Sequence, residues 1–282
     1  MKLSEMKAIL DAGRIRLTKS LGQNFLHDAN QLRRIADAAE LTKTDKVLEI
    51  GPGLGGLTEL LAERAGQVLA IEKDARLAAV LRERFHPDLG GEPRLRLVHD
   101  DALEWLRRSA CDWRDWKLVA NLPYSVASRL LVELAQGRLG PQRMAATLQL
   151  EVARRLMAQA GRPDYGVLTL LVQLNYQPRG WFKIPASCFF PEPEVDSACV
   201  CLARRPQPLL APEQAPVFTA IVKRSFSQRR KMMRKLLQAD WPAEKLDRAF
   251  ARLDPQPLPP QARAETVTLE QFVGLARFLS TD

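Results

Sequence analysis

One strand-to-helix turn constrains the fold of this chain more than any other feature. A mostly apolar strand pattern, Val47–Ile50, runs directly into Gly51, Gly53 and Gly56, and a helical pattern follows. Glycines at such a turn allow positive φ angles and let a ligand approach the backbone closely. Glu72 stands about 20 residues further along, where the dinucleotide fingerprint expects a carboxylate for a ribose diol. The turn therefore predicts an α/β sheet with a nucleoside-like ligand at its edge.

The glycine turn leaves three interpretations open. NAD and S-adenosylmethionine both present a ribose diol to a carboxylate such as Glu72, and the turn can also be purely structural. Pro52 inside the turn favours the methyl donor. So does Asp101, which follows the third strand pattern and can accept a hydrogen bond from an adenine amine. Its neighbour Asp100 is a weaker alternative for that carboxylate.

Strand and helix patterns alternate along the first 205 residues. The expected strands are Val47–Ile50, Val68–Ile71, Leu95–Val98, Leu118–Ala120, Ala145–Leu150, Thr169–Leu174 and Ala198–Leu202. The expected helices include Ala29–Glu40, Leu57–Ala65, Arg76–Phe85, Ala127–Gln136 and Glu151–Ala160. This alternation predicts a Rossmann-like α/β fold with seven mostly parallel strands and helices on both faces. Fewer helices separate the last three strands, so an antiparallel edge is expected there.

A proline-rich stretch divides the chain. Pro206, Pro208, Pro212 and Pro216 disfavour both helix and sheet, so this stretch is interpreted as a linker. We therefore predict a ligand-binding domain over residues 1–205 and a small all-helical domain over residues 206–282. The expected helices of the second domain are Val217–Leu237 and Leu269–Leu279, on either side of a loop over Pro255–Pro260.

Composition favours a nucleic-acid partner and argues against several other classes. The formal net charge of +9 predicts an anionic partner. The apolar runs are too short to cross a bilayer, and Met1–Lys19 lacks the apolar core of a secretory signal, so a cytoplasmic protein is expected. The three histidines and four cysteines show neither metal-ligand spacing nor a disulfide framework, so no metal site is expected.

A short segment after the fourth strand carries the most specific chemistry. Asn121, Leu122, Pro123 and Tyr124 follow the carboxyl end of that strand, which is where ligands bind in open α/β sheets. The side-chain oxygen of Asn121 and the backbone carbonyl of Leu122 can hold the two N–H groups of an adenine N6 amine. Tyr124 can stack on the base. The alternative is a strand cap with a buried tyrosine, which the upstream glycine turn and strand-end acids disfavour.

Across nearly its whole length the chain resembles the small-subunit ribosomal RNA adenine N6,N6-dimethyltransferases. The resemblance rests on Lys19–Asp28, the glycine turn, Asn121–Tyr124, Phe189–Ser197 and Arg224–Lys231, with further matches at Gln149–Leu156 and Tyr165–Leu168. It implies a class I methyltransferase fold and S-adenosylmethionine as the methyl donor. The implied donor-binding residues are Asn24, Leu26, Gly51, Gly53, Glu72, Asp101 and Asn121.

The resemblance also implies the substrate and the target-binding residues. Two adjacent adenosines in a 3′-terminal hairpin of small-subunit RNA, within an immature subunit, would each receive two methyl groups from a cytoplasmic, monomeric enzyme. Phe189 would stack on the extruded base opposite Tyr124. Lys223–Lys235 carries seven basic residues and no acid, and on one continuous helix Arg224, Lys231 and Lys235 would share a face. The expected RNA-binding residues are Arg224, Arg229, Arg230, Lys231 and Lys235.

Three rival functions stay open at this point. The nearest is the related large-subunit RNA methyltransferase that confers antibiotic resistance, which shares the Asn121–Tyr124 segment. The others are a nicotinamide enzyme and a non-catalytic RNA-binding assembly factor. Ser125 and Glu194 depart from the residues usual at those positions of the resembled family, and Glu194 leaves the details of RNA contact uncertain.

Overall fold

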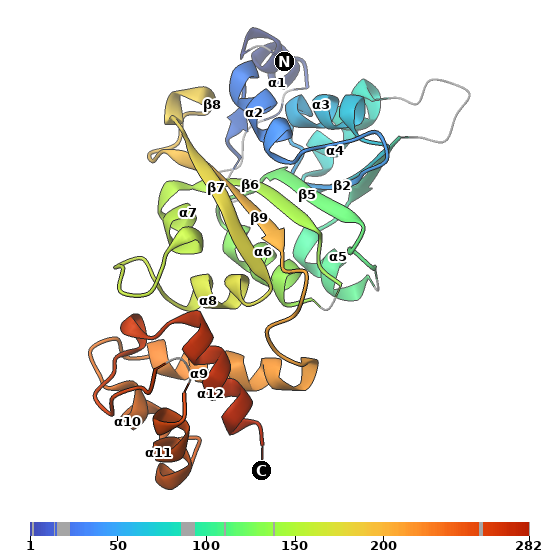
Figure 1. Cartoon of the computed structure of the whole chain (residues 1–282). Helices are drawn as coiled ribbons and strands as arrows, with labels where there is room; N and C mark the ends of the chain where they lie inside the picture. The colour runs from blue at the N-terminus through green and yellow to red at the C-terminus, as the bar shows by residue number, and fades with distance from the viewer. Residues whose placement is uncertain are drawn as a thin grey trace. The chain divides into compact units, whose positions relative to one another are not determined.

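The architecture was obtained as a computed structural model, which describes residues 1, 3–13, 15, 23–85, 94–109, 111–137, 139–253 and 256–281 (Figure 1). Two compact units are present. The first comprises Met1–Ala153 and Pro178–Arg204, and the second comprises Arg154–Gln177 and Arg205–Asp282. The expected division at residues 205/206 lies one residue from the junction between Arg204 and Arg205, whereas Arg154–Gln177, expected in the first domain, groups with the C-terminal residues. No helix in the described part of the chain is long and apolar enough to span a membrane.

A seven-stranded sheet organises the first unit. Its strands lie in the order β4 (Leu95–His99), β3 (Gln67–Glu72), β2 (Lys46–Ile50), β5 (Trp116–Asn121), β6 (Arg143–Gln149), β9 (Ser197–Arg204) and β7 (Tyr176–Ile184). The pairs from β4 to β6 are parallel, and β9 runs antiparallel to β6, so the antiparallel edge is confirmed. The strand order reverses between β2 and β5, which is the switch point where open α/β sheets bind ligands.

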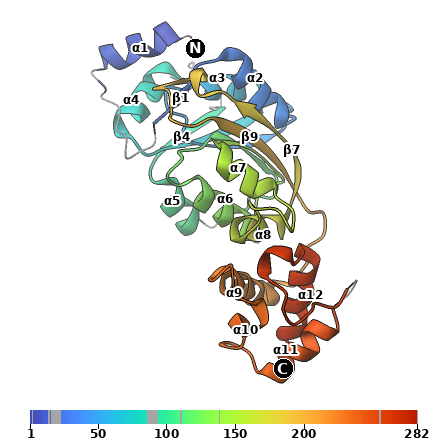
Figure 2. The ribbon, with the colours of Figure 1, turned by 90° about the vertical axis from the view of Figure 1, so that its left-hand side faces the viewer.

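Helices cover both faces of this sheet. The helices are α1 (Leu3–Ala12), α2 (Ala29–Ala38), α3 (Gly56–Arg64), α4 (Ala75–Arg84), α5 (Ala102–Arg108), α6 (Ala127–Gln136) and α7 (Leu150–Met157). Figures 1 and 2 show α2 and α3 on one side of the sheet and α5 and α6 on the other. Val47, Leu48 and Ile50 are at most 2% exposed because both faces of β2 are covered. This double burial explains the nearly continuous apolar runs of the parallel strands.

The expected strand Thr169–Leu174 was wrong: these residues belong to helix α8 (Val167–Gln173). A short apolar run fits a buried helix as well as a buried strand, and here the helix is buried on several sides. The seventh strand is instead β7, which the sequence did not indicate because it contains Pro178 and Gly180. Both residues are tolerated because β7 is an edge strand of the sheet.

The second unit contains four longer helices after the proline-rich stretch. They are α9 (Ala215–Phe226), α10 (Met233–Leu237), α11 (Ala243–Ala251) and α12 (Leu269–Leu279). Aromatic rings build its core: Phe272 lies 6.5 Å from Phe218 and 6.2 Å from Phe226 between ring centroids. Tyr165, from the segment before α8, packs edge-on against Phe226 and donates a 2.8 Å hydrogen bond to the Val267 carbonyl.

The expected single helix Val217–Leu237 was also wrong, because the helix stops at Phe226 and restarts at Met233. The intervening residues 227–231 are turns and a bend. A tertiary contact redirects the chain, since the Met233 N–H donates to the Ala262 carbonyl at 2.9 Å. The expected common face of Arg224, Lys231 and Lys235 therefore does not exist. Helix α11 was not anticipated.

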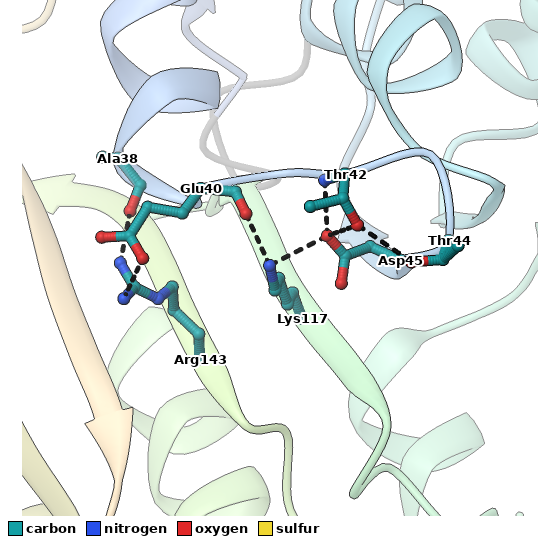
Figure 3. A network of polar contacts seen from close by, with 7 residues as sticks. All are labelled: Ala38, Glu40, Thr42, Thr44, Asp45, Lys117 and Arg143. Carbon is teal, nitrogen blue, oxygen red and sulfur yellow. Dashed lines mark hydrogen bonds and ion pairs between the residues drawn. The ribbon is translucent and has the colours of Figure 1, made fainter.

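At the end of the sheet opposite the glycine turn, a buried lysine connects strand β5 to the loop after α2. Lys117, near the start of β5, is 8% exposed. Its Nζ donates to the Glu40 carbonyl at 2.7 Å and to the Asp45 carboxylate at 2.9 Å (Figure 3). Burial alone would raise the pKa of Asp45, but hydrogen bonds from Lys117 and Thr42 outweigh it and hold the pKa below its ordinary value.

A second cation strengthens the same connection. Arg143, at the start of β6, donates to the Ala38 carbonyl at 3.1 Å and pairs with the Glu40 carboxylate at 2.6 Å (Figure 3). Both cations bind the end of α2 and the loop that follows it. They therefore join this loop to the starts of two central strands.

Lys117→Met should lower the free energy of unfolding by about 2–4 kcal/mol, because it leaves a nearly buried carboxylate without its cation. The lowered pKa of Asp45 adds stability above the ordinary aspartate pKa of about 4 and loses it as pH falls through the folded-state pKa. The difference in free energy of unfolding between wild type and Lys117→Met should therefore become smaller as the pH falls. Urea unfolding at pH 7 and near pH 3 measures both effects. The exposed Lys46→Met is the control, and an equal loss there would refute the role of Lys117.

Candidate active site

A cavity of about 330 Å³ opens at the carboxyl ends of the parallel strands in the first unit. Most of its lining comes from residues 23–26, 49–54, 71–73, 100–103 and 121–126. Ten of the residues singled out in the sequence line it together: Asn24, Leu26, Gly51, Gly53, Glu72, Asp101, Asn121, Leu122, Pro123 and Tyr124. Segments far apart in sequence meet here because the strand ends share one edge of the sheet.

The glycine turn adopts a backbone that only glycine accommodates without strain. Gly51 and Gly53 have φ angles of 70° and 61°. A Cβ on Gly53 would lie 2.8 Å from the ring of Phe25, and one on Gly51 would lie 3.2 Å from Pro123. The missing side chains thus let the turn pack directly against the segment after β5 and against β1 (Phe25–Leu26).

Glu72 at the end of β3 fixes the turn and faces the cavity. Its two carboxylate oxygens accept hydrogen bonds from the Gly53 N–H at 3.0 Å and the Asp74 N–H at 2.9 Å. Burial raises the pKa of Glu72, and these two backbone donors partly offset that rise. Each carboxylate oxygen keeps a free lone pair, so the residue can also accept from a ribose diol.

Asp101 begins α5 and forms part of the cavity wall. One oxygen caps the helix by accepting from the N–H groups of Leu103 at 2.9 Å and Glu104 at 3.2 Å. The other pairs with the Lys73 ammonium at 2.8 Å, which holds the pKa of Asp101 below its ordinary value. Asp100 also lines the cavity and pairs with Arg108. Asp101 is therefore anionic and fixed in place, as an acceptor for an amine must be.

Asn121, the last residue of β5, presents an unused acceptor. Its Nδ2 donates to the Asn24 carbonyl at 3.0 Å, which fixes the orientation of the amide. Its Oδ1 is buried and has no hydrogen-bond partner among the described residues. A buried polar atom without a partner is costly, and because Asn121 lines the cavity, a ligand there can supply the missing donor. Lys19–Gly22, which the sequence also implicated, lie outside the described residues.

Tyr124 is anchored by a contact that the sequence did not reveal. Its hydroxyl lies 2.5 Å from the Ser197 hydroxyl at the start of β9. Burial raises the pKa of Tyr124, so the phenol stays neutral near pH 7. The ring is thus held at the cavity as a neutral aromatic surface. Two further residues line the cavity: Met6 of α1, and Lys73, which also pairs with Asp101. No local sequence pattern had singled out either of them.

Phe189 lies in a core cluster and is not among the residues that line the cavity. It lies in β8 (Phe189–Phe190), is 2% exposed, and packs into the core cluster with Leu26, Leu32 and Ile35. Its neighbour Phe190 is half-buried, packs against the cluster that contains Met6, and is joined to Pro191 by a cis peptide bond. A stacking role for Phe189 would require its ring to leave the core.

The expected RNA-binding residues differ in availability. Arg224 forms two hydrogen bonds to Asp240 at 2.7 and 3.0 Å, and Arg229 donates to the Pro163 carbonyl at 2.8 Å. Arg230, Lys231 and Lys235 are exposed, and their side chains form no ion pair within the described residues. The last three are therefore the free cations of this group.

Comparison with known proteins decides the family. Residues 14–279 match the family model for ribosomal RNA adenine dimethylase. The chain belongs to the ribosomal RNA adenine dimethylase family. Among curated members, a ribosomal RNA small subunit methyltransferase A from Geobacillus sp. (strain WCH70) is 37% identical over 97% of this chain and 95% of its own length. The one from Pelotomaculum thermopropionicum is 40% identical over 92% and 90%.

Solved structures agree with this dimethylase family. The 23S rRNA methyltransferase ErmE superposes with a TM-score of 0.66 and 30% identity, covering 90% of this chain and 99% of its own. A dimethyladenosine transferase from Plasmodium falciparum gives a TM-score of 0.68 at 23% identity, covering 89% and 95%, and supports the fold. The class I methyltransferase fold expected from the resemblance is confirmed.

Phe189→Ala should lower the free energy of unfolding by about 3–4 kcal/mol, because it opens a cavity in the core of the sheet domain. Phe190→Ala should cost less than half as much, since that ring is only half-buried. Urea unfolding followed by circular dichroism compares the two. Equal losses would contradict the burial of Phe189 and favour a ring that spends much of its time at the cavity.

Proposed function

We propose that this dimethylase transfers methyl groups from S-adenosylmethionine to the N6 amines of two adjacent adenosines in a 3′-terminal hairpin of small-subunit ribosomal RNA. The observation that supports this most directly is the buried, unpartnered Oδ1 of Asn121. An adenine amine supplies the N–H that this oxygen lacks. The Leu122 carbonyl, on the adjacent residue of the same cavity lining, is the second acceptor.

The cavity suits the proposed donor. Glu72 lies where it would bind the ribose hydroxyls, Asp101 would accept from the donor adenine amine, and Asn24 and Leu26 close the side toward the N-terminal segment. When bound, S-adenosylmethionine supplies a sulfonium methyl group that a nitrogen lone pair attacks in line. Gly51 and Gly53 give the turn its positive φ angles, and its backbone thereby lines the cavity where this ligand would bind.

The proposed contribution of the protein to the reaction is to place two hydrogen-bond acceptors, Asn121 Oδ1 and the Leu122 carbonyl, on the adenine N6 amine. Accepting both N–H groups turns the nitrogen lone pair out of conjugation with the ring and toward the donor. Positioning and electrostatics of this kind account for most of the acceleration in such displacements. No strong base is required, because the amine becomes acidic once it carries the new methyl group. The raised pKa of Tyr124 agrees with a stacking role and not a basic one.

The target base must leave its stack, and aromatic rings recover part of that cost. Tyr124, held through Ser197, is one side of the proposed stack. Phe189 remains our proposal for the other side, reached by movement of its ring out of the core cluster. Phe190, directly beside it and half-buried, is the alternative ring on the same short strand.

The small-subunit substrate is favoured over its nearest rival by the relatives. Curated relatives at 37% and 40% identity are named small-subunit methyltransferases, whereas the large-subunit enzyme ErmE is 30% identical. We further propose an immature small subunit as the acting partner, a cytoplasmic site of action and a monomeric enzyme. Nucleoside mass spectrometry after incubation with donor and either immature small subunits or large-subunit RNA tests the substrate. Dimethyladenosine only in the large-subunit RNA would overturn the assignment.

Asn121→Ala should reduce methylation of small-subunit RNA by about 100-fold or more, because one of the two amine acceptors is lost. RNA binding measured by filter retention should change far less. Asn30→Ala, an exposed asparagine on α2, is the matched control. Methylation at the wild-type rate in Asn121→Ala would remove this residue from the mechanism.

Replacing Arg230, Lys231 and Lys235 together by alanine should flatten the dependence of log K on log salt by about 2–3 units, since each free cation releases about one counterion. Arg234→Ala is the control, because that guanidinium is already paired with Asp247 at 2.6 Å. RNA binding measured between 50 and 300 mM salt, about the range where such slopes are steep, gives both values. Equal slopes in the triple variant and wild type would exclude these residues from phosphate contact.

A further inference from the structure

A second buried carboxyl group faces the donor cavity and is not used by the mechanism above. Glu49 lies on β2 two residues before Gly51, is 1% exposed, and contributes to the cavity lining. Its Oε2 has no hydrogen-bond partner within the described residues. A carboxyl oxygen buried without a partner is as costly as the Asn121 oxygen, and it likewise points to a ligand.

Within the described residues, no cation is paired with Glu49, and the nearby Lys73 is paired with Asp101 instead. The groups that interact with it are the Thr58 hydroxyl of α3 and the carboxylate of Glu72 on the neighbouring strand. Burial, together with the like charge of Glu72, raises the pKa of Glu49 to about 8, and Thr58 only partly offsets this. Burial and this like charge therefore favour the protonated, neutral form of Glu49 near pH 7.

The other acids around the cavity behave differently. Asp74 is held by Arg76 and Gln23, and Asp101 by Lys73, so the pKa of each lies below its ordinary value. Glu72 has two backbone donors. Glu49 alone among these four has neither a cation nor a backbone donor. It is thus the group whose charge an incoming cation would change most.

The donor and its product differ by one positive charge. S-adenosylmethionine carries a sulfonium, and methyl transfer leaves a neutral thioether, while the ammonium and carboxylate are common to both. We propose that Glu49 releases its proton to solvent when the sulfonium donor binds and takes one back when the thioether product forms, so that the cavity prefers donor over product. This inference rests on the proposed function, because it requires the donor to occupy this cavity.

The sign of the pH effect follows from linkage. A cation favours ionised Glu49, so its pKa falls in the donor complex, and donor affinity rises with pH and levels off only above about pH 8, where the free group becomes mostly ionised. The thioether lowers the pKa less, so its affinity rises less steeply. The ligand amine titrates equally in wild type and variants, and comparing them removes its contribution.

The experiment is calorimetry of S-adenosylmethionine and S-adenosylhomocysteine between pH 6.5 and 8.5, in pairs of buffers that differ in ionisation enthalpy. Wild type should release up to about one more proton on binding the donor than on binding the product near pH 7. Glu49→Gln should lose this difference, and its preference for donor over product should fall by about tenfold. Glu49→Asp should retain part of the proton release, and exposed Glu63→Gln should behave as wild type.

Two results would overturn the inference. One is equal proton release by wild type for both ligands, which requires no variant to fold. The other is an unchanged proton difference in a folded Glu49→Gln, as judged by thermal unfolding. This second result is the one expected if Glu49 has only a structural role, because Glu49→Gln would then alter stability without changing proton release. Failure of wild type to bind the donor at all would instead remove the proposed function.

Discussion

The hydrogen bond from Asn121 Nδ2 to the Asn24 carbonyl is the constraint on which the site depends. A carbonyl can only accept, so the amide nitrogen must face Asn24 and Oδ1 must face away from it. One contact thereby aims the acceptor and also joins two segments that lie 97 residues apart. The residues on either side of the cavity, β1 and the end of β5, are positioned by the same bond.

Charges of opposite sign lie at the two proposed binding sites of the protein. Its formal net charge is +9, and free cations such as Arg230, Lys231 and Lys235 suit a polyanionic RNA. The cavity, in contrast, has Glu49, Glu72 and Asp101 in its wall. The proposed cationic donor and the proposed anionic RNA would therefore each meet residues of opposite charge. Desolvation of these carboxylates is offset in different ways: backbone N–H groups donate to Glu72, and the Lys73 ammonium pairs with Asp101.

Much of the sheet could be predicted from the sequence, and the exceptions have identifiable causes. Strands β2, β3, β5 and β6 were found because burial on both faces leaves nearly continuous apolar runs. Strand β4 has no fully buried residue and was found from Leu95, Leu97 and Val98. Helix α8 was mistaken for a strand, since a six-residue apolar run fits either structure. Strand β7 was missed because Pro178 and Gly180 interrupt its pattern, which only an edge position tolerates. The break after α9 depends on a contact between Met233 and Ala262, which no local pattern records.

The sequence by itself determined the chemistry available at the sheet edge. The glycine turn, Glu72, Asp101 and Asn121–Tyr124 were recognisable because each is a short segment whose backbone or side-chain needs are local. Only the tertiary structure decided which atoms are left without partners. The free Oδ1 of Asn121, the isolated carboxyl of Glu49 and the burial of Phe189 all depend on neighbours from distant segments. Hydrogen bonding and desolvation are set by what lies within a few ångströms in space, and a linear sequence does not specify that.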